Sequence, residues 1–285
     1  MFVLSSVLAG VAAAGEPPGP VDGGSDECAS GYCKRPIPPE LRGDLSDAAR
    51  IGRLIFEQDE VSARATDMLY ARAPSEKGGG RLRGWVTLPG PWWRVVFFVS
   101  TGSDVGIGYE LDYPADEPPE RARPTFRRID PPRSPDPDER ARFTAIQTAI
   151  SAVNQAKEAC GPNVNPVVLP GSILGQKGWL VYLLASTHER GTVVQGGHQR
   201  FLVTDDGRAV VSSEQLSRCA LQHLPEKTVG LALNTPFYDH PNEGHVFTSL
   251  STRLDFFLGT ERGLWKIKGS EILFFEPVSS ARQGQ

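Results

Sequence analysis

The stretch Trp92–Tyr113, WWRVVFFVSTGSDVGIGYELDY, contains two runs of β-branched and aromatic residues separated by a short polar turn. Val, Ile, Phe and Tyr favour extended strands, whereas the Gly, Ser and Asp of 101–104 are typical of turns. A connection this short joins antiparallel neighbours, because parallel strands need a long crossover. The stretch therefore predicts two adjacent strands, Trp92–Ser100 and Gly106–Tyr113, of an antiparallel sheet.

A helix and a further strand precede these two strands. Between Leu45 and Ala71 apolar residues recur at helical spacing, and either Asp44 or Ser46 has the side-chain oxygen that an N-cap requires. The segment Arg83–Leu88 then reads as the first strand of the sheet. Residues 44–113 are therefore predicted to form one α+β unit, a helix followed by an antiparallel meander.

The same order recurs in the second half of the chain. Asp136, Pro137 and Glu139 resemble a capping box, with the proline at the first helical position. The helix that they predict ends near Cys160, before Gly161-Pro162. The strands expected after it are 164–169, 178–186, 193–204, 209–215, 228–233, 245–250, 254–258, 263–268 and 271–275. We expect residues 140–285 to form a second α+β unit.

Residues 114–139 connect the two predicted units. This stretch holds eight prolines and twelve charged residues, and proline supplies no amide donor to a helix or to a central strand. It is predicted to be a Pro-rich linker whose C-terminal end caps the second helix. The alternative is one long surface loop within a single domain. The expected fold class is α+β, with two helix-plus-antiparallel-meander units joined by a Pro-rich linker.

The N-terminus carries an uncharged apolar run. Residues 1–14 end in an A-x-A pattern and are followed by Gly15-Glu16-Pro17-Pro18, as at the cleavage site of a secretory signal peptide. The run has no preceding Lys or Arg, which leaves a short buried helix as the alternative. Residues 15–43 lack a hydrophobic period and are predicted to be a flexible leader. We therefore expect a secreted or periplasmic protein.

The four cysteines are interpreted in the light of that compartment. Cys28 and Cys33 enclose a short loop, while Cys160 follows the second helix and Cys219 follows a predicted strand. In an oxidising compartment the simplest pairing is Cys28–Cys33 with Cys160–Cys219, although four cysteines allow three connectivities. Free buried thiols and a redox or zinc role are the alternatives.

Charge and hydropathy limit the partners. A net charge of −4 gives no electrostatic case for nucleic acid. The N-terminal apolar run is shorter than the roughly 20 residues that a membrane span needs, so no span is expected in the mature chain. An envelope protein, a peptide or a glycan remains as the expected partner, and no cofactor is predicted.

Trp92 and Trp93 are the candidate ligand-binding residues. Adjacent side chains in a strand point to opposite faces, so both cannot lie in one core. A flat tryptophan on the other face could stack on a sugar or a peptide. The alternative is that another part of the same chain covers it.

His198, Glu243 and His245 are the candidate metal ligands. All five histidines fall between His188 and His245, and imidazole with carboxylate suits zinc or iron. The alternative is that the histidines are ordinary polar residues in loops or at strand ends. The catalytic residues remain unknown, because no serine-hydrolase, phosphate-binding or H-E-x-x-H motif occurs.

These observations favour a non-catalytic binding or scaffolding protein. The alternative function is a metal-dependent envelope hydrolase that uses the His198, Glu243 and His245 region. The sequence leaves open whether the protein is an enzyme.

Overall fold

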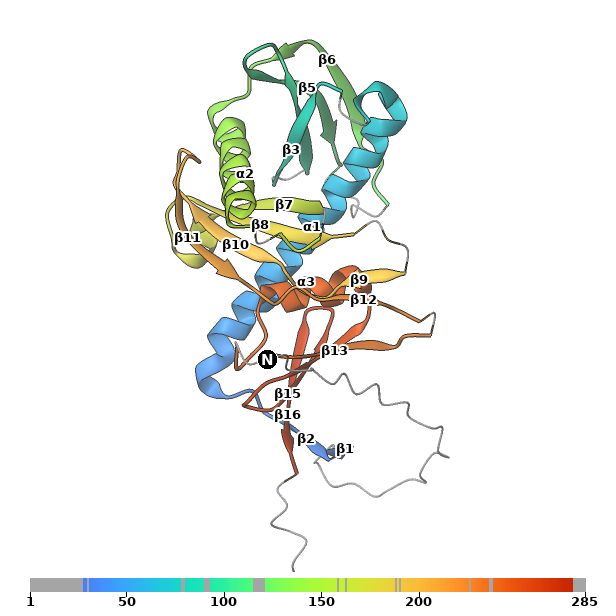
Figure 1. The fold of residues 1–285 in the computed structure, drawn as a ribbon, viewed down its shortest axis with the longest axis vertical. Helices are drawn as coiled ribbons and strands as arrows, with labels where there is room; N and C mark the ends of the chain where they lie inside the picture. The colour runs from blue at the N-terminus through green and yellow to red at the C-terminus, as the bar shows by residue number, and fades with distance from the viewer. Residues whose placement is uncertain are drawn as a thin grey trace, which may run out of the picture.

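The computed structural model describes residues 28–278 except 30, 78–79, 90–92, 115–120, 158, 162, 188, 190, 226 and 236–237. Helices and mostly antiparallel strands occur together in several sheets, so the predicted α+β class is confirmed (Figure 1). The two-unit layout with a Pro-rich linker is not confirmed, because residues after 140 contribute to more than one sheet. The predicted signal peptide, 1–14, lies outside the described residues.

Three α-helices occur in the described residues: α1 (Arg42–Arg72), α2 (Pro137–Ala156) and α3 (Glu243–Thr252). Three short 3-10 segments, at Pro39–Leu41, Pro74–Glu76 and Gly171–Leu174, lie at helix ends and in turns. None of these helices combines the length and the apolar composition that crossing a bilayer requires.

The strands of the described residues form three larger sheets and one small ribbon. The first sheet is β3 (Leu82–Leu88), β4 (Arg94–Ser100), β5 (Val105–Asp112) and β6 (Thr125–Arg133), in that order. The second sheet, in the order β11-β10-β8-β7, contains β7 (Asn163–Pro170), β8 (Trp179–Ser186), β10 (Gln199–Val203) and β11 (Val210–Gln215). The ribbon pairs β9 (Thr192–Val194) with β12 (Leu221–His223).

The third sheet joins the two ends of the described chain. Its order is β1-β2-β16-β15-β14-β13, from β1 (Cys28–Ala29), β2 (Tyr32–Arg35), β13 (Gly230–Asn234), β14 (Asp255–Gly259), β15 (Leu264–Lys268) and β16 (Glu271–Pro277). The pair β13–β14 is parallel, and α3 forms the crossover between them. The N-terminal strand β2 pairs with β16, so part of the segment predicted as a flexible leader is built into this sheet.

The long helix α1 passes all three larger sheets and packs against each in turn (Figure 1). Leu45 belongs to the core of the third sheet, Ile55 to that of the second and Leu69 to that of the first. The helix has 31 residues and is therefore about 46 Å long. No side chain caps its N-terminus; the 3-10 turn Pro39–Leu41 leads directly into it, so the expected caps Asp44 and Ser46 lie within the helix instead.

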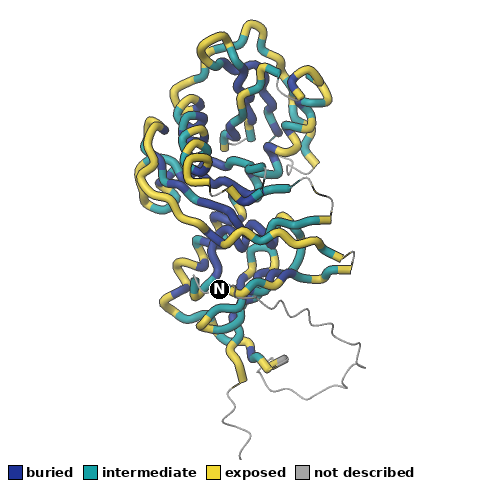
Figure 2. The backbone as a smooth tube through the Cα atoms, in the orientation of Figure 1, coloured by how far each residue is buried: buried dark blue, intermediate teal, exposed yellow. Residues whose placement is uncertain are grey.

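The central strands of the first two sheets are buried on both faces. In β4, Phe97 faces the core that contains α1, while Phe98 stacks on Phe143 of α2 with ring centroids 4.0 Å apart. In β8, Tyr182 faces α1 and Val181 faces α2. This double burial explains why both strands read as continuous apolar runs rather than alternating ones, and the buried backbone follows these strands in Figure 2.

The capping box of α2 is confirmed. The Asp136 Oδ1 accepts a hydrogen bond from the Glu139 amide (2.8 Å), and Glu139 Oε2 accepts one from the Asp136 amide (2.9 Å). The Arg133 guanidinium bridges Glu139 and Glu110 of β5, at 2.6 Å and 2.5 Å. These contacts fix the start of α2 to the first sheet, of which β6, from the Pro-rich segment, is itself a strand.

The strand expected at 245–250 is wrong, because these residues belong to α3. The apolar run is too short for its periodicity to separate helix from strand. The deciding residue is Asn242, whose Oδ1 accepts hydrogen bonds from the amides of Gly244 and His245 at the helix N-terminus.

Both predicted disulfides are present, Cys28–Cys33 and Cys160–Cys219. The first closes the β1–β2 hairpin. The second ties the segment after α2 to the segment after β11, and Gly197 packs directly against it. Two disulfides indicate that the protein folds in an oxidising environment.

Replacing Gly52 by alanine should destabilise the protein. A Cβ at this position would lie 2.6 Å from Val246 Cβ and 2.9 Å from the Glu243 carbonyl oxygen, where α1 crosses α3. We expect a loss of about 1–3 kcal/mol, as for other overpacked cores. Chemical denaturation measures it. Gly43→Ala in the same helix is the control, because its Cβ would meet no atom within 4 Å; equal effects would exclude the packing explanation.

Removing the two disulfides should have unequal effects. Cys160 and Cys219 are 59 residues apart, whereas Cys28 and Cys33 are 5 apart. On the chain-entropy model the disulfide that closes the longer loop contributes about 4 kcal/mol to the free energy of unfolding, and the other about 2 kcal/mol. Urea denaturation of the two paired Cys→Ser variants tests the order. A larger loss for the Cys28–Cys33 pair would contradict it.

Candidate ligand-binding cavity

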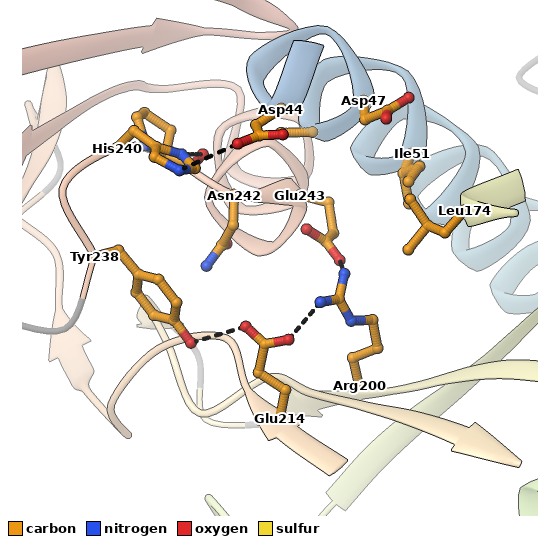
Figure 3. A pocket seen from close by; sticks show the side chains of 12 residues that line it. Asp44, Asp47, Ile51, Leu174, Arg200, Glu214, Tyr238, His240, Asn242 and Glu243 are labelled. Atoms are coloured by element: carbon orange, nitrogen blue, oxygen red, sulfur yellow. Dashed lines mark hydrogen bonds and ion pairs between the residues drawn. The ribbon is translucent and has the colours of Figure 1, made fainter. Parts of the chain in front are cut away.

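A cavity of about 320 Å³ lies between the start of α1, the start of α3 and the β10–β11 hairpin. This volume is at the lower end of the range for small-molecule sites. Figure 3 shows polar side chains from all three elements directed toward it. Asp44, Asp47 and Ile51 come from α1, Arg200 from β10 and Glu214 from β11.

The start of α3 supplies the most buried acid of the cavity. Glu243 is the first residue of the helix, where the positive end of the helix dipole stabilises a carboxylate. Its side chain is only 6% exposed. The preceding residue, Asn242, also lines the cavity, and its Nδ2 donates to the Leu216 carbonyl (2.7 Å). The cap therefore fixes α3 against the end of β11.

Arg200 lies between two carboxylates. Its Nη1 donates to Glu243 Oε1 (2.5 Å), and its Nη2 donates to Glu214 Oε2. Tyr182 also donates to Glu243 Oε1, at 3.1 Å. Burial lowers the pKa of the guanidinium, but the charges of Glu243 and Glu214 outweigh it and raise that pKa above its ordinary value. Arg200 is therefore charged and held rigidly.

Two aromatic side chains complete the far wall of the cavity. The Tyr238 hydroxyl lies 3.3 Å from Glu214 Oε1 and 2.5 Å from the Gln215 carbonyl oxygen, and burial raises its pKa to about 12. The His240 Nδ1 lies 2.9 Å from the Pro241 carbonyl, so it carries the proton and donates. The His240 Nε2 is 4.0 Å from Asp44 Oδ2 at the cavity rim.

The cavity is acidic. Its described lining residues include four carboxylates, from Asp44, Asp47, Glu214 and Glu243, and one guanidinium, Arg200, which is already paired with two of them. Asp47 has a partner of its own in Arg50, but that ion pair is solvent-exposed and contributes little. The arrangement attracts a cation.

A larger cavity, about 470 Å³, lies at one end of the strands of the third sheet and is a weaker candidate. Its lining residues include Tyr32, Thr260 and Arg262, and every one of them is exposed or half-buried. Arg262 is moreover paired with Asp239 and Glu40. This surface offers no buried charge that a ligand would have to match.

The predicted metal ligands His198, Glu243 and His245 do not form a shared site. Glu243 contacts Arg200 and Tyr182, while His198 and His245 are each 1% exposed. The His198 Nδ1 accepts from the Ala185 amide, and His245 Nδ1 accepts from the Asn242 amide. Among the described residues, no three His, Cys, Asp or Glu side chains are grouped so that they could hold a metal ion.

Of the two tryptophans predicted to bind ligand, Trp92 lies outside the described residues. Trp93 precedes β4, is half-buried and packs against the core shared by α1 and the first sheet. Its carbonyl accepts a hydrogen bond from the Tyr113 amide (2.8 Å). It lines neither the cavity around Glu243 nor the one around Arg262.

Sequence reasoning missed Arg200, Glu214 and Tyr238. They lie far from Asp44 in the chain, and only the crossing of α1 over the second sheet brings them together. No spacing pattern could reveal them. The available local signal was Asn242-Glu243 before an apolar run, which is a helix start.

Searches against protein-family models, curated proteins and solved structures found no match.

The two buried histidines should make stability depend on pH. Burial lowers the pKa of His198 to about 4 and that of His245 to about 3, from an ordinary 6.5. Below pH 6.5 the unfolded chain binds protons that the folded protein does not, so the free energy of unfolding falls. We expect each histidine to lower the free energy of unfolding by about 2 kcal/mol between pH 7 and pH 5. Asp59, whose pKa burial raises to about 6, acts in the opposite sense.

Urea denaturation of His245→Gln isolates one of these contributions. Glutamine at this position keeps an acceptor for the Asn242 amide but does not titrate. Between pH 7 and pH 5 the free energy of unfolding should fall by about 2 kcal/mol less in the variant than in the wild type. His223→Gln, at an exposed position, is the control. The same pH dependence in His245→Gln and wild type would show that His245 is not buried as a neutral group.

Proposed function

We propose that this protein is a non-catalytic binding protein that acts in the periplasm or outside the cell. Its ligand would occupy the acidic cavity between α1, α3 and the β10–β11 hairpin, and would carry a positive charge. The observation that carries the proposal is the pairing of Arg200 with both Glu214 and Glu243. This pairing neutralises the guanidinium of Arg200, so the carboxylates of the cavity keep a net negative charge.

The compartment is supported by the cysteines and by the N-terminal sequence. No free cysteine occurs in the described residues, and both disulfides would be reduced in an ordinary cytosol. The apolar run 1–14, with its A-x-A ending, is typical of an export signal.

The construction of the cavity supports binding. Three of its charged groups are held before any ligand arrives: the Asn242 cap orients α3, Arg200 pairs with Glu214 and Glu243, and Tyr182 donates to Glu243. A site that is already ordered loses little conformational entropy when it binds. A cationic ligand would interact with Asp44, Asp47 and Glu214, whose side chains are more exposed than that of Glu243.

The alternative, a metal-dependent hydrolase, has less support. It would need His198 and His245 to turn toward Glu243, yet their Nδ1 atoms accept backbone hydrogen bonds inside the core. Their rings also pack against Phe247 and Phe256, respectively. Rotating either ring would leave a buried amide without an acceptor, which is costly.

Simple cations test the proposed function. Agmatine and 1,5-diaminopentane should raise the melting temperature and bind with a measurable Kd, because their charged ends match the carboxylates of the cavity. The neutral analogue 1-pentanol should have no effect. Differential scanning fluorimetry and isothermal titration calorimetry provide the readouts. Equal effects of the diamine and the alcohol would contradict the proposal.

Matched variants locate the binding. Glu214→Gln and Asp44→Asn should each weaken diamine binding at least threefold, since each removes one carboxylate from the cavity. Asp67→Asn should leave binding unchanged. Asp67 is an exposed residue of the same helix, 23 positions from Asp44 by their numbers and therefore roughly 35 Å away along α1. Equal weakening by all three variants would indicate nonspecific charge attraction.

A further inference from the structure

Strand β11 is an open sheet edge beside the cavity. In the second sheet it is the last strand, and within the described residues it pairs with β10 alone. All six of its residues are exposed, and Val211 is 60% exposed. In Figure 1 the β10–β11 hairpin lies at the outer side of the molecule. Such an edge presents unpaired backbone groups to another chain.

The outward backbone groups can be assigned from the ladder. The Leu216 amide donates to the His198 carbonyl, toward β10. Antiparallel ladders alternate, so Glu214 also faces β10 while Ser213 and Gln215 direct their amides and carbonyls away from it. The Tyr238 hydroxyl contacts the Gln215 carbonyl, which agrees with this assignment. A bulge at Val211 ends the regular ladder, so the usable edge runs from Ser212 to Gln215.

The same strand carries one wall of the cavity. Glu214 lies directly opposite Arg200 in the ladder, and both side chains are directed into the cavity (Figure 3). A chain added along β11 would place alternate side chains on this face of the sheet. The one beside Glu214 would reach the carboxylate cluster, and opposite charges on neighbouring strands attract.

We propose that the ligand is an extended peptide segment that adds to the free edge of β11 and places a lysine or arginine side chain in the acidic cavity. Main-chain hydrogen bonds to the Ser213 amide and carbonyl and to the Gln215 amide would hold the segment, since the Gln215 carbonyl already accepts from Tyr238, and the carboxylates would select the side chain. This inference rests on the proposed function, because it uses the same cavity. It adds the chemical class of the ligand, a basic peptide, and a second binding element, the edge of β11.

A second copy of this chain fits the edge less well. Its own β11 reads VVSSEQ and contains no lysine or arginine. Pairing two copies along β11 would bring a further glutamate to each acidic cavity and no cation. Charge complementarity therefore favours a basic peptide over self-association.

Two acetylated and amidated peptides test the side-chain requirement: Thr-Val-Lys-Val-Thr and Thr-Val-Gln-Val-Thr. Isothermal titration calorimetry with the full chain should show at least tenfold tighter binding of the lysine peptide. N-methylation of its backbone amides should abolish binding, because the donors to the edge are lost. Binding that is indifferent to lysine or to N-methylation would overturn the inference.

A pair of variants tests the edge itself. Ser213→Pro removes the outward amide of β11 without removing an amide that faces β10, and proline is tolerated at sheet edges. It should weaken binding of the lysine peptide at least tenfold and leave 1,5-diaminopentane binding unchanged, whereas Ser213→Ala should preserve both. Equal peptide binding by Ser213→Pro and wild type would overturn the inference. If Ser213→Pro does not fold, the N-methylated peptide on wild-type protein decides.

The outcomes separate the two proposals. Diamine binding without lysine-peptide binding would refute peptide addition to β11 and leave the proposed cation-binding cavity standing. Absence of both kinds of binding would refute both proposals. Light scattering tests whether a second copy of this chain binds to β11 instead. A dimer that Ser213→Pro dissociates would make β11 an interface between copies and would also overturn the peptide inference.

Discussion

The crossing of α1 over α3 at Gly52 and Val246 is the contact on which the remaining structure depends. A helix pair can approach this closely only where one partner lacks a side chain, and Gly52 provides that position. Because α3 is also the crossover between β13 and β14, its position fixes the third sheet. Phe247 of α3 belongs to the core of the second sheet as well. One contact therefore aligns two sheets, and the continuation of α1 reaches the third.

Local sequence signals predicted the elements that local chemistry determines. The Asp136–Glu139 capping box, the apolar stripe of α1 and both disulfide pairings follow from neighbouring residues or from simple spacing. The start of α1 was less predictable, because a preceding 3-10 turn takes the place of a side-chain cap. The identity of α3 depended on Asn242, whose side chain accepts from two helix amides.

The assignment of strands to sheets could not be predicted from the sequence. Continuous apolar runs such as β4 and β8 indicate burial on both faces, but they do not say which helix covers which face. The N-terminal strand β2 is short and polar, and it exists because β16 offers it a partner. Pairing between distant segments leaves no periodic trace in either of them.

The candidate site illustrates the same limit. Histidines and tryptophans attracted attention because they are chemically versatile, yet His198 and His245 serve as buried neutral groups. Of the residues that line the cavity, Arg200 is an ordinary charged residue of an internal strand and Glu214 of the edge strand beside it. Their significance comes from their mutual pairing and from the buried Glu243 beside them, which only the three-dimensional arrangement creates.

The pairing of β2 with β16 has a consequence for how the molecule is assembled. Arg35 lies opposite Phe274, so nearly the whole described chain separates two residues that become neighbours. During synthesis β2 can pair with β1, but its other edge must remain unpaired until β16 has been made. Contacts of such long sequence separation close late and slowly, because the entropy of the intervening loop is lost first. The third sheet is therefore the natural final step of folding, after α1 already has the other two sheets to pack against.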